Sequence, residues 1–249
     1  MRMMILTTVC CSVAAFGGEP EAKEWQAPNG VTVKYRWSAP AAMEPGKTYP
    51  VVLFLHGAGE RGTDNRAQLQ HGVTAILAAA KQLDQPCFLI APQCPNDLWW
   101  APIDHDTKRL SGAAKPNPLL EAVLALVADT AKHQPVDPQR LYVTGLSMGG
   151  FGTWDLLGRA PERIAAAIPI CGGGDPARVE NFKQVPIWAF HGEADPVVPV
   201  SCTREMIAAL KQAGGSPKAT YYPQVQHDSW TRTYANLEVL KWLFAQRAK

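Results

Sequence analysis

The sequence predicts an α/β fold in which helices cover both faces of a mostly parallel, doubly wound sheet. The first observation is a series of continuous apolar runs, typical of strands buried on both faces; these are residues 51–55, 87–91, 141–145, 164–170 and 185–190. The second observation is that helix-compatible stretches separate the runs. This alternation implies right-handed crossovers, and in such a sheet the ligand site lies beyond the carboxyl ends of the strands.

Two further strands and five helices complete the predicted fold. Residues 31–37 (VTVKYRW) alternate like a half-exposed edge strand, and residues 219–223 (ATYYP) form a later strand. Gly214 and Gly215 end the fourth helix. The expected helices cover residues 67–82, 117–133, 148–158, 201–213 and 234–247.

The composition indicates a single domain over residues 18–249. The chain has 249 residues, of which 47% are hydrophobic and 18% charged, which suits one large core. The net charge of +2 is spread along the chain, so we expect no nucleic-acid partner. Beyond the N-terminus, no stretch approaches the ~20 apolar residues that a membrane span needs.

The first 17 residues have the features of a secretory signal peptide. Arg2 precedes a short apolar stretch, and Ala15 and Gly17 place small residues where a signal peptidase requires them. A disordered or buried N-terminal segment is one alternative, because Thr and Ser interrupt the apolar stretch, and lipidation of Cys10 or Cys11 is another. We expect a secreted or periplasmic protein.

The other cysteines are predicted to be buried thiols. None forms a C-x-x-C pair, and a domain of this size does not need disulfides; the four are Cys87, Cys94, Cys171 and Cys202. The sequence has no H-E-x-x-H motif and no Cys/His cluster with zinc-ligand spacing. We therefore expect no metal.

The loop after residues 51–55, HGAGERG, has the spacing G-x-G-x-x-G. This spacing is found in dinucleotide-binding loops, where the following helix starts at once and holds the pyrophosphate at its N-terminus. Here Glu60 would put a carboxylate beside the phosphates, and the helix is expected only near residue 67. A cofactor is therefore not expected, and the loop's N–H groups are better suited to an oxyanion.

The motif GLSMG, residues 145–149, has the form G-x-S-x-G. It follows a buried strand and precedes a helix-compatible stretch, which is the setting of a nucleophile elbow. Glycines at 145 and 149 would avoid collisions around a turn that strains the backbone of Ser147. A glycine-rich turn with an N-capping serine is the alternative.

A nucleophilic serine needs a base, and His227 is the best placed of the six histidines. It lies in a polar loop between the last strand and the last helix. His56 and His191 each precede a glycine at a strand end, where we expect packed, hydrogen-bonded structural residues. The acid should lie between serine and histidine in the chain. Asp195 fits best, followed by Glu193 and then Asp175.

The order of Ser147, Asp195 and His227, with GLSMGG, HGEADPVVP and HDSW at three strand ends, resembles the α/β-hydrolase superfamily. Within it, LHGAGERG, APQCP and the His-x-x-Trp ending are similar to bacterial phospholipase/carboxylesterase-like and feruloyl-esterase-like serine hydrolases. Dienelactone hydrolases share the fold but place Cys at the elbow, where this chain has Ser.

The resemblance implies a serine-dependent carboxylic ester hydrolase with a Ser-His-Asp triad and an acyl-enzyme intermediate. Met148 and Ala58 are the expected N–H donors of the oxyanion hole. Gly57 and Gly59 would let the backbone approach the substrate. A prolyl-oligopeptidase-like peptidase and a non-catalytic hydrolase-fold binding protein are the alternative functions.

The substrate is expected to be a small-molecule or polysaccharide-linked ester, such as a feruloyl or acetyl ester. Residues 92–116 form a long connection that contains Trp99 and Trp100. These rings are expected substrate contacts, with packing in the core or at the rim as an equal alternative. Residues 171–184 leave room only for a minimal lid, so we expect an open site.

Overall fold

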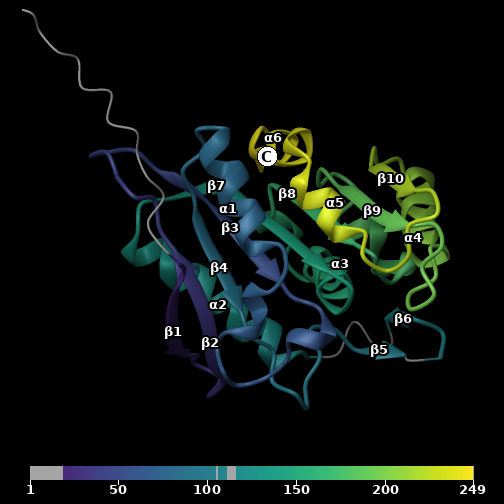
Figure 1. Ribbon diagram of the computed structural model, residues 1–249, viewed down its shortest axis with the longest axis horizontal. Helices are drawn as coiled ribbons and strands as arrows, with labels where there is room; N and C mark the ends of the chain where they lie inside the picture. Colours follow the sequence, from purple (N-terminus) through teal and green to yellow (C-terminus); the bar gives the residue numbers. More distant parts are fainter. Residues whose placement is uncertain (1–18, 105, 111–115, 249) are drawn as a thin grey trace, which may run out of the picture.

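The computed structural model describes residues 19–104, 106–110 and 116–248, and its centre is one eight-stranded sheet (Figure 1). The sheet strands are β1 (Glu21–Gln26), β2 (Thr32–Ser38), β3 (Tyr49–Leu55), β4 (Phe88–Pro92), β7 (Val136–Leu146), β8 (Ala166–Ile170), β9 (Trp188–Gly192) and β10 (Lys218–Tyr222). Their order is β1-β2-β4-β3-β7-β8-β9-β10. The predicted signal peptide, residues 1–17, lies outside the described residues.

The predicted mostly parallel sheet is confirmed. The pairs β1/β2 and β2/β4 are antiparallel, and the remaining pairs run parallel from β4 to β10. The carboxyl ends of β3, β7, β8, β9 and β10 therefore meet at one edge. The loops that carry the predicted catalytic residues begin at this edge.

Helices cover both faces of the sheet, as predicted. One core cluster lies between the sheet and the helices α2 (Pro118–His133), α3 (Met148–Arg159) and α4 (Ser201–Gln212). The other packs the opposite face against α1 (Val73–Gln82) and α6 (Leu237–Phe244). Alternate residues of β3 divide between the two clusters, because successive side chains of a strand point to opposite faces. In the described part of the chain, no helix combines the length and apolarity needed to cross a bilayer.

Four features of the fold differ from the prediction. The helix expected over residues 67–82 begins only at Val73, and Ala67–Leu69 form a separate 3₁₀ helix. β1 was not expected, since its side chains are exposed or half-buried and give little hydrophobic signal. The long connection before α2 contains a hairpin of β5 (Ile103–Asp104) and β6 (Arg109–Leu110), strands too short to show periodicity. The expected last helix is divided into α5 (Trp230–Ala235) and α6, because Asn236 is extended and its side chain accepts the Glu238 N–H as a cap.

Candidate active site

Ser147 lies at the sharp turn between β7 and α3, as the GLSMG motif predicts. Its backbone has φ +52° and ψ −117°, a conformation that residues other than glycine rarely adopt. Its N–H donates to the carbonyl of Ile170 at 3.0 Å, which joins the turn to β8. A Cβ on Gly149 would collide with the backbone carbonyl of Leu55, and one on Gly145 would collide with Gly149. Glycine is therefore required at both positions for strand and helix to meet this closely.

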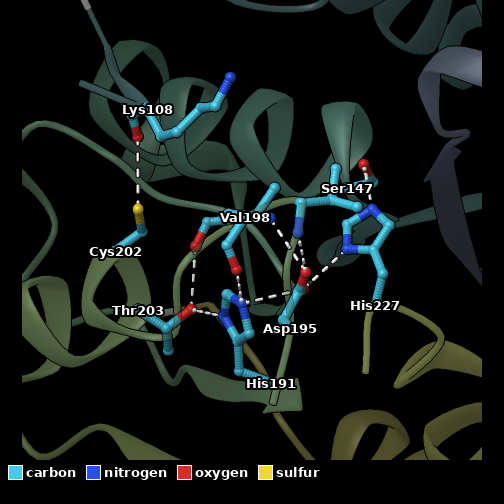
Figure 2. A network of polar contacts seen from close by, with 10 residues as sticks. Lys108, Ser147, His191, Asp195, Val198, Cys202, Thr203 and His227 are labelled. Atoms are coloured by element: carbon cyan, nitrogen blue, oxygen red, sulfur yellow. Dashed lines mark hydrogen bonds and ion pairs between the residues drawn. The ribbon is translucent and has the colours of Figure 1, made fainter. Parts of the chain in front are cut away.

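Ser147, His227 and Asp195 are joined in one series of hydrogen bonds (Figure 2). His227 Nε2 lies 2.9 Å from Ser147 Oγ, and His227 Nδ1 lies 2.7 Å from Asp195 Oδ2. Since an ionised carboxylate only accepts, Nδ1 carries the proton and Nε2 can accept from the serine hydroxyl. The three residues follow β7, β9 and β10, so the parallel sheet brings together side chains that are far apart in the chain.

The carboxylate of Asp195 is fully buried and accepts several hydrogen bonds. Its Oδ1 accepts the N–H groups of Val197 and Val198, at 2.8 and 2.9 Å. Burial favours the protonated carboxyl, but the bonds from His191, His227 and the two N–H groups outweigh it. They hold the pKa of Asp195 well below its usual value, so the group stays ionised at neutral pH.

The two alternative acids have other partners. Glu193 forms an ion pair of 2.6 Å with Arg204. The Asp175 side chain accepts the Ala177 N–H at 3.0 Å and caps the 3₁₀ helix Pro176–Asn181. The structure brings Asp195 to His227 and gives neither alternative such a contact.

The loop HGAGERG runs beside the elbow and folds into a short 3₁₀ helix, Ala58–Glu60. A Cβ on Gly57 would lie 3.7 Å from the Cβ of Ser147, whereas one on Gly59 would meet open space. In the described part of the chain, the backbone N–H groups of Ala58 and Met148 make no hydrogen bond. Both predicted donors are thus unengaged next to the serine. A helix N-terminus also favours negative charge, which suits Met148 as the first residue of α3.

Arg61 holds this loop in place. Its Nε donates to the carbonyl of Ala58 at 3.1 Å, and its Nη1 donates to the carbonyl of Asn96 at 3.0 Å. The guanidinium lies 4.5 Å from the ring centre of Trp99, at cation–π distance. Arg61 therefore joins the HGAGERG loop to the connection after β4.

His56 supports the same loop from beneath as a buried, neutral imidazole. Its Nε2 accepts the Cys94 N–H at 2.9 Å, so the ring proton must be on Nδ1, which donates to the Gly57 carbonyl at 2.6 Å. Burial is the largest cause that lowers the pKa of His56, to about 4; the charge of Arg61 adds to this, and the bond to Gly57 opposes it. The expected packed, hydrogen-bonded role of His56 is confirmed.

Trp100 does not occupy the position of a substrate contact. It is fully buried, its Nε1 donates to the His56 carbonyl at 3.0 Å, and its ring packs edge-on against the His56 ring. The predicted contact is wrong because the indole fills the core beneath the loop. Trp99 is half-buried with Arg61 on its ring, and its contact with substrate stays a prediction.

Two contacts at this site were not expected from the sequence. His191 lies 3.3 Å from Asp195 Oδ2, and Arg61 clamps the HGAGERG loop. The four-residue spacing between His191 and Asp195 is a possible sequence signal, but it does not show that the loop folds back on the histidine. No local pattern could have paired Arg61 with Trp99.

One group of described side chains has the composition of a metal site. Ligand atoms of Cys171, Asp195 and His227 lie within 4.8 Å of one another. Asp195 and His227 are bonded to each other, and burial raises the pKa of the Cys171 thiol. Because a thiolate is the form that binds metal, this group is poorly suited to one. The four described cysteines are buried thiols, as expected.

Comparisons with known proteins agree with the fold. A thermostable esterase of known structure is 41% identical, with a TM-score of 0.86, over 92% of this chain and 63% of that one. The feruloyl esterase module of Clostridium thermocellum, solved with sinapinate, is 15% identical with a TM-score of 0.69, over 95% and 90% of the two chains. At that identity the similarity shows the fold alone.

A curated relative is similar over much of this chain. The uncharacterised peptidase YuxL of Bacillus subtilis (strain 168) is 24% identical over 247 residues, which are 84% of this chain and 35% of that protein. The chain therefore spans about a third of YuxL and less than two thirds of the thermostable esterase.

The family comparison confirms the resemblance to the α/β-hydrolase superfamily. The model of the dienelactone hydrolase family matches residues 104–237, more than half of the chain. The match includes the elbow, where this chain has Ser147 in place of the cysteine expected of that family. With the sheet order and the elbow already described, this chain belongs to the dienelactone hydrolase family.

Proposed function

We propose that this chain is a carboxylic ester hydrolase in which Ser147 is the nucleophile, His227 the base and Asp195 the acid of the triad. The observation that carries the proposal is the unbroken series of hydrogen bonds from Asp195 through His227 to Ser147. The strained turn at Ser147 supports it, because strain of this kind concentrates at functional sites. Membership of a hydrolase family supports it independently.

In the first half of the reaction, Ser147 Oγ attacks the ester carbonyl carbon while His227 Nε2 takes the hydroxyl proton. Asp195 stabilises the resulting imidazolium and stays ionised, since its pKa is low. The bond from carbon to the leaving alcohol then breaks as His227 returns the proton to the alcohol oxygen. Ser147 is left acylated. Water repeats these steps, releasing the acid and restoring the serine.

The tetrahedral intermediate of each half carries a negative oxygen that needs hydrogen-bond donors. The N–H groups of Ala58 and Met148 would supply them, because both are unengaged and belong to segments that flank Ser147. Gly57 permits the close approach, with the nearest atoms to a Cβ at this position being side-chain atoms of Leu146 and Glu60. Mutagenesis of such donors elsewhere shows effects of roughly 10²–10³ on kcat for each.

For the substrate we infer an extracytoplasmic ester with an aromatic acyl group or a bond to polysaccharide. Two exposed apolar side chains lie on loops at the site edge of the sheet, Leu98 and Val197, with 40% and 54% exposure. Trp99 adds a half-buried ring on the Leu98 side. Such a rim suits an apolar or aromatic acyl group. The signal-like N-terminus supports a secreted or periplasmic location.

The experiment that tests the nucleophile is labelling with a fluorophosphonate probe. The protein should be labelled, Ser147→Ala should abolish labelling and ester hydrolysis, and Ser201→Ala, at an exposed site in α4, should change neither. Labelling that persists in Ser147→Ala would overturn the assignment. Aryl, acetyl and feruloyl esters should be cleaved in preference to aminoacyl anilides; the reverse preference would make the peptidase the better function.

A further inference from the structure

His191 lies on the far side of the Asp195 carboxylate from His227 (Figure 2). It is the next-to-last residue of β9 and is completely buried. Its Nε2 lies 2.9 Å from the carbonyl oxygen of Val198 and 3.3 Å from Asp195 Oδ2. In the proposed ester hydrolysis this imidazole neither takes nor returns a proton.

The donor role of His191 Nε2 follows from these partners. A backbone carbonyl can only accept, so Nε2 of His191 must carry a proton directed at Val198. The same N–H faces Asp195 Oδ2 at the longer distance, and Val198 N–H donates to Asp195 Oδ1. His191, Val198 and Asp195 therefore form a closed ring of polar contacts around the carboxylate.

The other ring nitrogen connects this ring of contacts to the body of the protein. His191 Nδ1 lies 2.7 Å from Thr203 Oγ1, on α4. The Thr203 hydroxyl donates to the carbonyl oxygen of Gly172 at 2.9 Å, in the segment after β8, so its oxygen accepts from His191 Nδ1. Thr203 is 1% exposed, so these bonds lie in a dry environment in which they hold their geometry well.

We propose that His191 is a positioning residue for the hydrolysis proposed above, and holds the Asp195 carboxylate in the orientation that receives His227 Nδ1–H. Asp195 Oδ1 is occupied by two backbone N–H groups, and Oδ2 faces one imidazole N–H on each side. A carboxylate with donors in all these directions cannot rotate without losing some of them. In this role no proton moves between His191 and Asp195.

Two substitutions separate this role from simple core packing. The amide nitrogen of Gln can reach the position of Nε2, whereas that of Asn reaches only the position of Nδ1 and the contact with Thr203. We expect His191→Asn to lower kcat by about 10- to 100-fold with KM nearly unchanged, since small misplacements of catalytic groups have effects of this order. His191→Gln should retain kcat within about fivefold of the parent protein.

Rates are measured per active site titrated with the fluorophosphonate, so a partly unfolded sample does not imitate the effect. A packing role predicts that both variants lose folded protein while each remaining site keeps the parent kcat. Equal kcat values per site in His191→Asn and the parent protein would overturn the proposal, as would equal impairment by Asn and Gln.

A second readout does not depend on ester hydrolysis. The proton between His227 Nδ1 and Asp195 Oδ2 should give a low-field ¹H NMR resonance, which His191→Asn should shift or broaden and His191→Gln should preserve. If esters are not cleaved but the resonance responds in this way, the proposed function fails while the positioning role of His191 stands. An unchanged resonance in His191→Asn would overturn that role.

If neither variant of His191 folds, Thr203→Val decides the question. It removes the hydroxyl that holds Nδ1 and keeps the shape of the side chain. We expect a kcat per titrated site that is lower by about two- to tenfold, a smaller effect than that of His191→Asn, with KM unchanged. A kcat equal to that of the parent protein would contradict the proposal.

Discussion

β3 is followed by His-Gly and β9 ends with His-Gly, and in both places the histidine is buried beneath the loop that it supports. In the first, His56 Nε2 accepts an N–H from Cys94, so the proton is on Nδ1. In the second, His191 Nε2 faces the carbonyl of Val198 and must donate. The Nε2 atoms of the two buried histidines therefore have opposite roles, acceptor in His56 and donor in His191.

The difference comes from the backbone group that each ring meets. Where a backbone N–H faces the ring nitrogen, that nitrogen must be an acceptor; where a backbone C=O faces it, the nitrogen must be a donor. In the loop after β3, the neutral imidazole of His56 lies beneath N–H groups that have no hydrogen-bond partner in the described part of the chain. An oxyanion would lie next to these N–H groups. At the end of β9, the N–H of His191 is directed toward the carboxylate of Asp195. This carboxylate would be the partner of the proposed His227 imidazolium. Around the same serine, the first loop thus offers N–H donors to a negatively charged oxygen, and the second offers a carboxylate to a positively charged imidazolium.

The largest expected effect comes from the carboxylate of the second loop. Asp195→Asn should lower kcat by about 10³- to 10⁴-fold, because the amide can no longer hold His227 in the tautomer that accepts the serine proton. Steady-state kinetics on an aryl ester and a thermal unfolding curve check this. Glu193→Gln, two residues away and paired with Arg204, is the matched control and should stay near parent activity. Full activity in Asp195→Asn would remove the second loop from the mechanism.

A smaller effect is expected on the stability of the protein in acid. The two loops should lose their contributions to the free energy of unfolding in different pH ranges. The pKa of His56 is lowered to about 4 from 6.5, so the unfolded chain binds this proton more readily. The contribution of His56 is complete above pH 6.5 and is lost as the pH falls toward 4, on the order of 3 kcal/mol in the free energy of unfolding. The pKa of Asp195 is also lowered, so its contribution is lost only below its ordinary value of 3.8.

Urea unfolding at pH 7 and pH 4.5 measures this dependence. His56→Gln has no titrating group, and its amide oxygen can accept the Cys94 N–H. The variant should therefore lose less stability than the parent protein over this interval. Equal losses in both proteins would show that the first loop does not depend on a neutral His56.

The smallest effect is expected from the clamp on the first loop. Arg61→Lys keeps the charge but loses the two-pronged contact with Ala58 and Asn96 and the stacking on Trp99. We expect kcat to fall by about tenfold, less than the roughly 10²- to 10³-fold effect of removing an oxyanion donor. Arg66→Lys, at an exposed position five residues on, is the control. A kcat unchanged by Arg61→Lys would show that the loop holds its shape without the clamp.

Much of the fold and part of the site can be predicted from the sequence. The apolar runs locate the buried strands, and the glycines around Ser147 mark the elbow, because strand burial and tight turns leave local patterns. The exposed strand β1 and the two-residue strands β5 and β6 leave none. Trp99 and Trp100 are adjacent and chemically alike, yet one lies at the rim and the other in the core.

By itself the sequence determined the alternation of strands and helices and the strand-turn-helix setting of Ser147, since each depends on neighbours in the chain. Only the tertiary structure decided that Asp195 rather than Glu193 meets His227, and that His191 lies behind it. It also decided that Nε2 accepts in His56 and donates in His191. These outcomes depend on backbone groups brought opposite the side chains by distant parts of the chain, and no local pattern encodes that encounter.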